Sequence, residues 1–171
     1  MRVASEQDQF SALIERHAGI VRKVATTYCR NADDRADLAQ EIVTQLWTAY
    51  PRYDASRPFT SWMYRVALNV AISHVRGVYR NARHFVPLSE EHEALAGGAA
   101  DHEKHGETAT LERVIGTLDP LNRALLLLYL DDRSHREIAD ILGISESNVG
   151  TRIGRLKQLL RKQLADSVQE Q

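Results

Sequence analysis

Apolar side chains recur at helical spacing along most of the chain, and no stretch shows the apolar–polar alternation of a half-buried strand. The first predicted helix runs from about Gln7 to Tyr28, where Gly19 costs roughly 1 kcal/mol relative to alanine. The second runs from about Asp34 to Tyr50 and ends at Pro51, and the third runs from Thr60 to about Arg80. The pattern therefore predicts an all-α fold.

The periodicity also assigns an inward side to each predicted helix. In the first three helices, the positions expected to face inward are Phe10, Leu13, Ile14, Ala18, Val21, Val24, Leu38, Ile42, Val43, Leu46, Trp47, Trp62, Met63, Val66, Val70 and Ser73. A short helix in the second half has on its inward side Leu111, Val114, Ile115 and Leu118. Asp119 then caps a helix that begins at Pro120. Residues 123–130 are apolar nearly all round, so this helix is expected to be central to its domain.

Residues 134–164 have the pattern of two helices joined by a tight turn. Ser134 and Glu137 form the S-x-x-E capping box at the start of the first helix. Gly143 stands where a left-handed residue ends a helix. Ser145 then caps the second helix, and Glu146 in its first turn suits the helix dipole.

The second helix of this pair divides into an apolar and a polar side. Its core positions are Val149, Ile153, Leu156 and Leu160. Between them lie the polar and cationic residues Asn148, Thr151, Arg152, Arg155, Lys157, Arg161 and Lys162. Such side chains are what a helix entering the major groove requires. An amphipathic helix pair with a solvated basic side is the alternative, but the turn residues and the basic side together favour a DNA-binding helix-turn-helix.

Low hydrophobicity and excess acid indicate a flexible linker over residues 87–110. His92, His102 and His105 lie in this stretch, which raises the possibility of a metal site. No cysteine lies nearby and no stable helix is expected to align the three imidazoles, so no metal is predicted. No cofactor is predicted either.

Charge and composition narrow the class of function. The net charge of −1 and the pI of about 6.7 mean that any DNA contact depends on local charge asymmetry. The single cysteine, Cys29, excludes an internal disulfide and is expected to be buried. No signal peptide is recognised, and the longest apolar run, 124–130, is too short to span a bilayer, so a cytoplasmic protein is expected. Without a nucleophile–base pair, metal-ligand spacing or phosphate loop, no enzyme is predicted.

Three stretches in order carry a resemblance to a known family. They are Asp37-Leu38-Ala39-Gln40-Glu41 followed by Trp47, then the run from Phe59 to Asn69, and then Leu118 to Arg155. On these motifs the chain resembles the extracytoplasmic-function (ECF) sigma factors, the minimal two-domain group of bacterial transcription initiation factors. The resemblance implies a region-two-like domain at 1–86, the linker at 87–110 and a region-four-like domain at 111–171.

The resemblance also implies partners and residue roles. The clamp of the largest catalytic subunit of core RNA polymerase would contact Asp37, Leu38, Gln40, Glu41 and Trp47. The downstream (−10) promoter element, read partly as non-template single strand, would contact Phe59, Trp62, Arg65 and Asn69. The upstream (−35) duplex would contact Asn148, Thr151, Arg152, Arg155 and Lys157. An anti-sigma factor is a further implied partner, and no membrane contact is expected.

Physical chemistry supports these roles and also leaves alternatives. The carboxylates of Asp37 and Glu41, four residues apart, share one helix face, which would otherwise be a solvated acidic surface. Aromatic residues interleaved with arginines from 52 to 65 suit single-stranded DNA, because bases stack on rings while cations hold phosphates. Trp62 is expected to be at least partly core, Phe59 to face either way, and Asn69 to read a base edge or bond a backbone carbonyl.

The upstream-reading helix departs from the family pattern at two positions. Gly150 and Gly154 stand where the family usually has longer, contacting side chains, so the promoter sequence is left open. The alternative function is a stand-alone LuxR-like helix-turn-helix regulator, in which the first ninety or so residues sense a signal or dimerise. An enzyme acting on a small ligand is a third class, but the chain lacks convergent titratable residues.

Overall fold

The computed structural model describes residues 5–83 and 107–169, and every regular element in those ranges is a helix. The predicted all-α class is therefore confirmed. Contacts divide the chain into two units, Met1–His74 and Val75–Gln171. Of the predicted linker, residues 87–106, with the three histidines considered for a metal, lie outside the described residues.

The first unit begins with two helices where the periodicity predicted one. Helix α1 (Glu6–Arg16) starts at a capping box made by Ser5 and Asp8, and helix α2 (Ala18–Tyr28) follows it directly. The break falls at His17, whose φ of −115° and ψ of 22° leave the helical region. The His17 ring lies 5.6 Å from the ring of Phe59, a tertiary contact that the local pattern does not reveal. The single long helix is therefore corrected to a helix pair.

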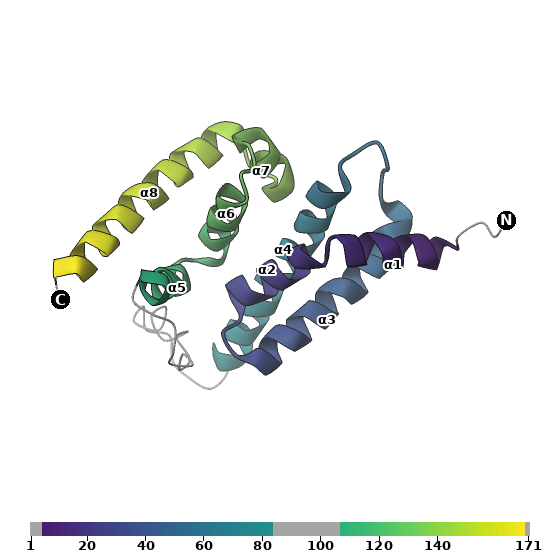
Figure 1. The fold of residues 1–171 in the computed structure, drawn as a ribbon, viewed down its shortest axis with the longest axis horizontal. Coiled ribbons are helices and arrows are strands. Elements are labelled where there is room, and N and C mark those ends of the chain that lie inside the picture. Colours follow the sequence, from purple (N-terminus) through teal and green to yellow (C-terminus); the bar gives the residue numbers. More distant parts are fainter. Residues whose placement is uncertain (1–4, 84–106, 170–171) are drawn as a thin grey trace. The chain divides into compact units, whose positions relative to one another are not determined.

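The rest of the first unit follows the sequence closely. Asn31 caps helix α3 (Ala32–Ala49), a 3-10 turn η1 (Tyr50–Arg52) follows, and helix α4 (Phe59–Arg83) starts in this unit and continues past its limit at His74. Helices α2 and α3 pack side by side, as Figure 1 shows. The largest fully buried side chains of this unit are Val24, Leu38, Ile42, Leu46, Met63, Tyr64 and Leu68. Ser73, predicted to face inward, is exposed, and so is Trp47.

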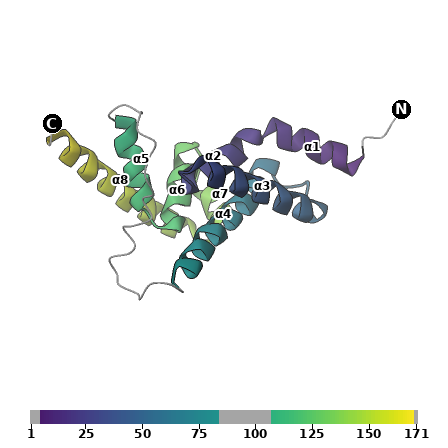
Figure 2. The ribbon, with the colours of Figure 1, turned by 90° about the horizontal axis from the view of Figure 1, so that it is seen from below.

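The second unit is organised around its last helix. Helices α5 (Glu107–Thr117), α6 (Pro120–Leu130) and α7 (His135–Leu142) all pack against α8 (Glu146–Gln169). These helices can be followed in Figure 2. Helix α5 begins four residues before the predicted Leu111. The predicted central role of α6 is confirmed, because four of its apolar residues are buried: Ala124, Leu125, Leu126 and Leu128.

A buried arginine ties α5 to α6. Arg123 has only 9% of its surface exposed, and it lies in the stretch that looked apolar nearly all round. Its Nε donates to the Leu118 carbonyl at 2.9 Å, and an Nη donates to the Gly116 carbonyl at 2.8 Å. These carbonyls lie at the C-terminal end of α5, where a helix leaves acceptors without intrahelical donors and carries partial negative charge. The guanidinium therefore serves as a C-terminal cap supplied by the next helix.

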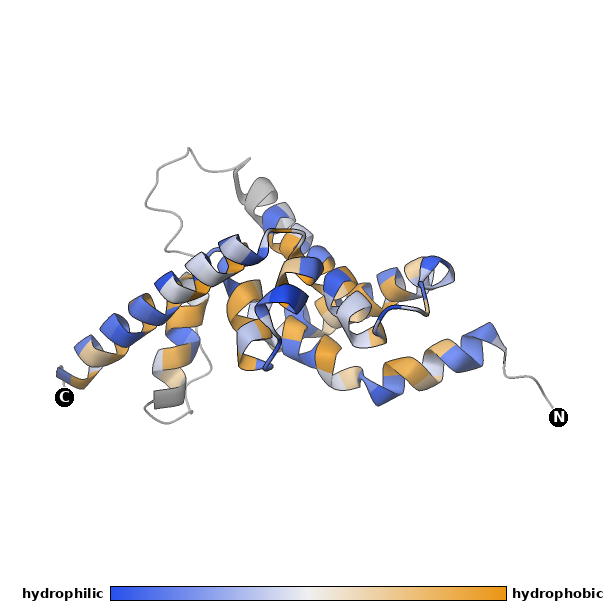
Figure 3. Cartoon of the chain, turned by 90° about the horizontal axis from the view of Figure 1, so that it is seen from above, coloured by the Kyte–Doolittle hydropathy of each residue, from blue (hydrophilic) through white to orange (hydrophobic). Residues whose placement is uncertain are grey.

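The helices are two-sided in hydropathy, as Figure 3 shows by colour. Within the described ranges, none combines the length and the apolar character that crossing a bilayer demands. Cys29 is buried, as predicted.

Candidate functional site

The side of α3 turned away from the core carries polar side chains. Asp37, Gln40 and Glu41 are exposed, and Trp47, near the end of the helix, keeps 43% of its surface exposed. Leu38 differs, because none of its surface is exposed. Leu38 therefore cannot touch a partner, and its predicted polymerase contact is corrected to a core position that anchors α3.

Glu41 is engaged across the helix interface. Its Oε2 lies 3.6 Å from Nδ1 of His74 on α4, an ion pair whenever the imidazole is protonated. Asp37, one turn earlier, has no such partner among the described residues. Of the two carboxylates that were predicted to act together, Asp37 is therefore the more available to a partner.

A shallow groove beside this surface was missed by the sequence analysis. It runs between the first two helices and α3, and its lining includes Ile14, Ala18, Val21, Ala36, Ala39 and Val43. Arg22 and Arg35 also line it. The signal was present in the alanines at 32, 36 and 39, which recur at helical spacing beside the core positions. Small side chains there leave room against α2 that larger residues would fill.

Aromatic rings from four elements form one continuous cluster in the first unit. Trp62 lies 5.0 Å from Tyr53 and 5.4 Å from Phe59, and Tyr53 lies 5.4 Å from Phe59, all between ring centroids. Tyr50 continues the cluster to Phe10 at 5.1 Å, which in turn lies 5.0 Å from Trp47. Tilted and edge-on rings at these separations attract one another beyond the effect of area burial. We call these six residues the ring cluster.

Phe59 and Trp62 are both half-buried within the ring cluster. The expectation that Trp62 is at least partly core is confirmed, and Phe59 takes the same intermediate environment. Each residue packs against Tyr53 and keeps part of its surface exposed, so the rings are held in place and remain accessible. A preordered ring loses little conformational entropy when a base stacks on it.

Tyr53 closes the loop between α3 and α4. Its hydroxyl donates to the Arg57 carbonyl at 2.7 Å, and Asp54 accepts from both the backbone and the hydroxyl of Ser56. Burial, followed by the charge of Asp54, raises the pKa of Tyr53 above its ordinary value. The bonds from Ser56 lower the pKa of Asp54. The phenol thus stays protonated as a donor and the carboxyl stays ionised as an acceptor.

Arg65 and Asn69 continue along α4 from Trp62. Both are exposed, and the spacings of three and four residues put the three side chains on one side of the helix. Ring, guanidinium and amide are therefore aligned on one rigid element. A surface of this kind can stack a base, hold a phosphate and hydrogen-bond a base edge.

The turn chemistry predicted for the second unit is confirmed at every capping position. Ser134 accepts from the Glu137 N–H at 3.1 Å, while the Glu137 carboxylate accepts from the Ser134 N–H at 3.0 Å. Gly143 has the left-handed φ of 68°, and Ser145 accepts from the backbone of Asn148. Helices α7 and α8 therefore form a helix-turn-helix.

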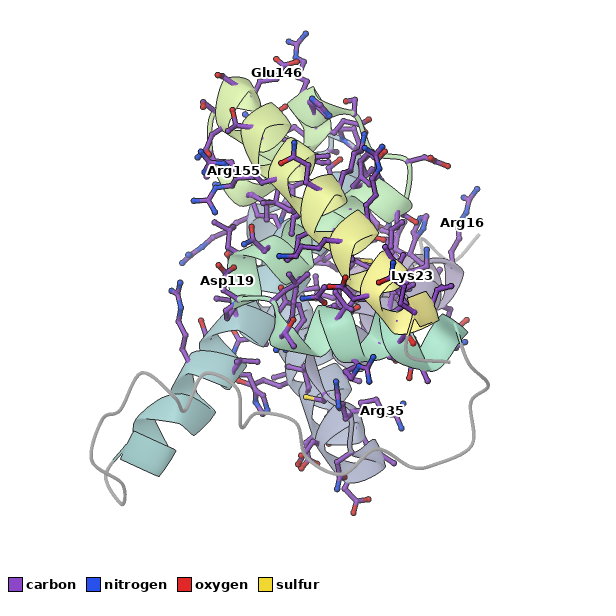
Figure 4. All side chains as sticks on the ribbon, turned by 90° about the vertical axis from the view of Figure 1, so that its left-hand side faces the viewer. Arg16, Lys23, Arg35, Asp119, Glu146 and Arg155 are labelled. Atoms are coloured by element: carbon purple, nitrogen blue, oxygen red, sulfur yellow. The ribbon has the colours of Figure 1, made fainter. Side chains whose placement is uncertain are left out.

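Helix α8 separates its core from its polar side. Val149, Ile153 and Leu156 are buried, whereas Thr151 and Arg155 are exposed. Figure 4 shows Arg155 projecting away from α8. The exposed guanidinium is free to meet base edges or phosphates.

All the predicted upstream-element residues except Arg155 make contacts within the unit, and the Thr151 hydroxyl donates to the Ser147 carbonyl at 3.1 Å. Arg152 is half-buried, and its Nε donates to Oδ1 of Asn148 at 3.0 Å. The Lys157 ammonium lies 4.8 Å from the ring centroid of Tyr129 on α6, a cation–π contact. Arg155 is thus the least constrained cation of the three.

In the described part of the chain, no group of three or more histidine, cysteine or acidic residues is placed to hold a metal ion.

Comparison with known proteins identifies both units. A family model described as Sigma-70 region 2 matches residues 13–81, and one described as Sigma-70, region 4 matches residues 108–160. The ECF sigma factor SigW of Bacillus subtilis is 26% identical over 171 residues, covering 94% of this chain and 91% of its own. The sigma factor CnrH of Cupriavidus metallidurans is 30% identical over 176 residues, covering 96% and 91%.

Solved structures agree on the fold. RpoE of Bartonella quintana, in complex with the anti-sigma factor NepR, aligns with a TM-score of 0.73 at 16% identity over 92% of this chain and 97% of that one. CnrH, in complex with the cytosolic domain of CnrY, aligns with a TM-score of 0.63 at 24% identity over 95% and 91%.

The region 2 match accounts for the first unit, which a stand-alone helix-turn-helix regulator would not need, so the LuxR-like alternative is not favoured. Sigma factors are non-enzymatic initiation factors that bind core RNA polymerase and promoter DNA. The chain belongs to the ECF sigma factors and directs promoter-specific transcription initiation.

Proposed function

We propose that the exposed side of α3, with the groove beside it, binds the polymerase clamp. Asp37, Gln40 and Trp47 offer a carboxylate, an amide and a large apolar ring that the fold leaves exposed. The single observation that carries this assignment is the exposure of these side chains on one element while Leu38 anchors that element from inside. A partner helix with basic and apolar side chains would complement this surface.

The downstream promoter element is assigned to α4. The partly exposed rings of Phe59 and Trp62 support stacking on a base of the non-template strand. Arg65 is in position to hold a phosphate, and the Asn69 amide to hydrogen-bond a base edge. These are non-covalent tasks, in keeping with a protein that has no catalytic activity of its own.

The upstream element is assigned to α8, with Arg155 and Thr151 as its main contacts. Lys157 and Arg152 contribute cationic charge from positions that neighbouring side chains restrict. Asn148 keeps its amide N–H groups for DNA, because its Oδ1 accepts from Arg152. We therefore propose that Arg155 and Thr151 make the main contacts of the five-residue site, supported by Arg152, Lys157 and Asn148.

We place the polymerase-binding and melting domain at 1–86 and the connecting segment at 87–106, with the upstream-reading domain starting at Glu107, where α5 begins. A cytoplasmic location follows from the partner. An anti-sigma factor is a further proposed partner, because the solved sigma factors RpoE and CnrH are bound to NepR and CnrY.

Run-off transcription with purified core polymerase tests the assignment. Promoter templates are transcribed with the wild-type protein and with variants at Asp37, Asn69 and Arg155. Core binding, strand opening by permanganate reactivity, and upstream-element protection are scored separately. We expect each variant to impair its own step. Tight promoter protection by the free protein, with no requirement for core polymerase, would contradict the division of tasks.

A further inference from the structure

The imidazole of His135 lies over the bare backbone of Gly150, where α7 meets α8. A Cβ built on Gly150 would lie 3.6 Å from Nδ1 and 3.9 Å from Cε1 of His135. Apart from residues adjacent in sequence, no other described side chain comes within 4 Å of that position. The imidazole therefore stands where a side chain at position 150 would extend.

Gly154, one turn further along α8, provides a contrast. A Cβ there would meet nothing within 4 Å. Neither position of α8 carries a side chain of its own. Of these two glycines, only Gly150 has a polar group from another helix within 4 Å of the position that a Cβ would take.

The His135 ring makes no polar contact within the part of the chain that the structure describes and is therefore available to a ligand. It is exposed and belongs to the first residue of α7, but the cap of that helix is made by Ser134 and Glu137. No ion pair or hydrogen bond of the ring occurs among the described residues. His135 also lines an open surface hollow with Tyr129 and Arg133.

His135 also lies close to the residues of α8 to which we assign DNA binding. Gly150 precedes the exposed Thr151 on α8, and the first helix of a helix-turn-helix crosses the DNA backbone while the second enters the groove. A glycine on the second helix allows close approach of the nucleic acid. If DNA binds α7 and α8 in this way, an imidazole that lies beside that glycine would be near the border between the groove and the backbone.

We propose that His135 is a DNA-contacting residue of the upstream-element site, providing from α7 the hydrogen-bond donor that Gly150 lacks on α8. The inference rests on the proposed function of α8 and adds a specificity-determining residue to it. The ring N–H donates to an acceptor on promoter DNA, either a purine edge or a phosphate oxygen.

The test is an exchange between the two positions. Full-length protein with core polymerase is assayed on a promoter library with a randomised upstream element, using wild type, His135→Ala, Gly150→Arg and the double variant. We expect His135→Ala to weaken promoter engagement roughly tenfold. In the Gly150→Arg background, His135→Ala should have little effect, because the arginine side chain would extend into the space beside Gly150 and make the DNA contact in place of the imidazole. Equal effects in both backgrounds would overturn the proposal.

Two readouts distinguish the acceptor. If His135 meets a base, His135→Ala relaxes preference at one or two neighbouring positions of the selected sequences. If it meets a phosphate, binding weakens uniformly across sequences and the salt dependence becomes shallower. Either result supports a DNA contact, and an unchanged preference with unchanged affinity refutes it.

Arg155→Ala separates this inference from the function on which it rests. A loss with Arg155→Ala but none with His135→Ala refutes only the histidine contact. No loss with either variant refutes the assignment of α8 itself. Gly154→Ala is the matched glycine control, since its new methyl group reaches no imidazole. Thermal unfolding of every variant excludes loss of fold as the cause.

Discussion

The side chains to which we assign DNA binding are placed differently relative to the core in the two units. In the first unit, Phe59 and Trp62 belong to the ring cluster that joins α1, α3, η1 and α4, so the residues assigned to DNA also hold the fold together. In the second unit, α8 buries Ile153 and exposes Arg155. On this assignment, the same side chains serve DNA binding and stability in the first unit, whereas α8 carries them on different sides in the second.

This difference has a physical basis. Stacking on a base requires a flat apolar surface, and such a surface is stable in water only when most of it is already packed. Reading duplex DNA requires charges and hydrogen-bond donors, which lose free energy when buried without partners. Substitutions in the ring cluster should therefore change both stability and DNA binding, whereas substitutions on the polar side of α8 should change only DNA binding.

The largest effect is expected on α3, where the assigned carboxylates are exposed or partly exposed, as the polar side chains of α8 are, but lie in the first unit. The double reversal Asp37→Lys with Glu41→Lys should weaken core polymerase binding by several kcal/mol, on the order of a hundredfold or more, because it sets like charges against the partner. Native gel shift with core polymerase measures this. Asp140→Lys with Asp166→Lys makes the same charge change in the other unit and should leave core binding intact. Equal binding by both double variants would contradict the α3 surface.

Trp62→Ala should be the most damaging single change within the ring cluster. Removing a half-buried indole from contact with three other rings should destabilise the first unit by about 3 kcal/mol. Trp47, the other tryptophan of the chain, reports on the same unit, so urea unfolding followed by fluorescence measures the loss. Trp62→Phe should recover most of the stability. An unchanged midpoint for Trp62→Ala would show that the cluster is not structural.

Arg155→Ala should give the opposite result to Trp62→Ala. Promoter affinity should fall by about 1–3 kcal/mol if the guanidinium contacts a base, while the free energy of unfolding stays within about 0.5 kcal/mol of wild type. Filter binding of the holoenzyme and thermal unfolding are measured side by side. A large loss of stability would mean that Arg155, like the ring cluster, contributes to the stability of the fold as well as to DNA binding.

Asn69→Ala tests whether a side chain on α4 can also contribute to DNA binding without contributing to stability. The exposed amide should matter for strand opening by about 1 kcal/mol and hardly at all for folding. Permanganate reactivity of the melted strand measures strand opening, and urea unfolding measures the stability of the fold. Normal opening would leave Asn69 with no part in reading the downstream element.

The smallest effect is expected from Gly154→Ala. A methyl group there meets open space, and replacing glycine in a helix interior should stabilise the second unit by about 0.5–1 kcal/mol. Thermal unfolding of the full chain measures the gain. Destabilisation would reveal a close approach at Gly154 that the helix geometry does not indicate.

The sequence predicted what local chemistry controls. The S-x-x-E pair, Gly143 and Ser145 specify caps and a turn through neighbours in sequence, so the helix-turn-helix could be predicted almost completely. The break at His17 could not, because the helical pattern continues across it and the ring contact with Phe59 is formed only in the folded unit. Leu38 was given an inward position by the periodicity and a partner contact by the motif, and its burial confirms only the inward position. The placement of His135 over Gly150 joins residues fifteen apart and requires coordinates.

The arginine at position 123 limits how far the chain can be shortened. A fragment starting at Pro120 would contain every residue of the helix-turn-helix but would lack the Gly116 and Leu118 carbonyls that accept from the Arg123 guanidinium. The fragment would lose both hydrogen bonds and the packing of α5 against α8, which together are a large part of the stability of a small domain. The smallest autonomous DNA-reading fragment should therefore start ahead of Glu107, even though α5 contributes none of the assigned DNA contacts.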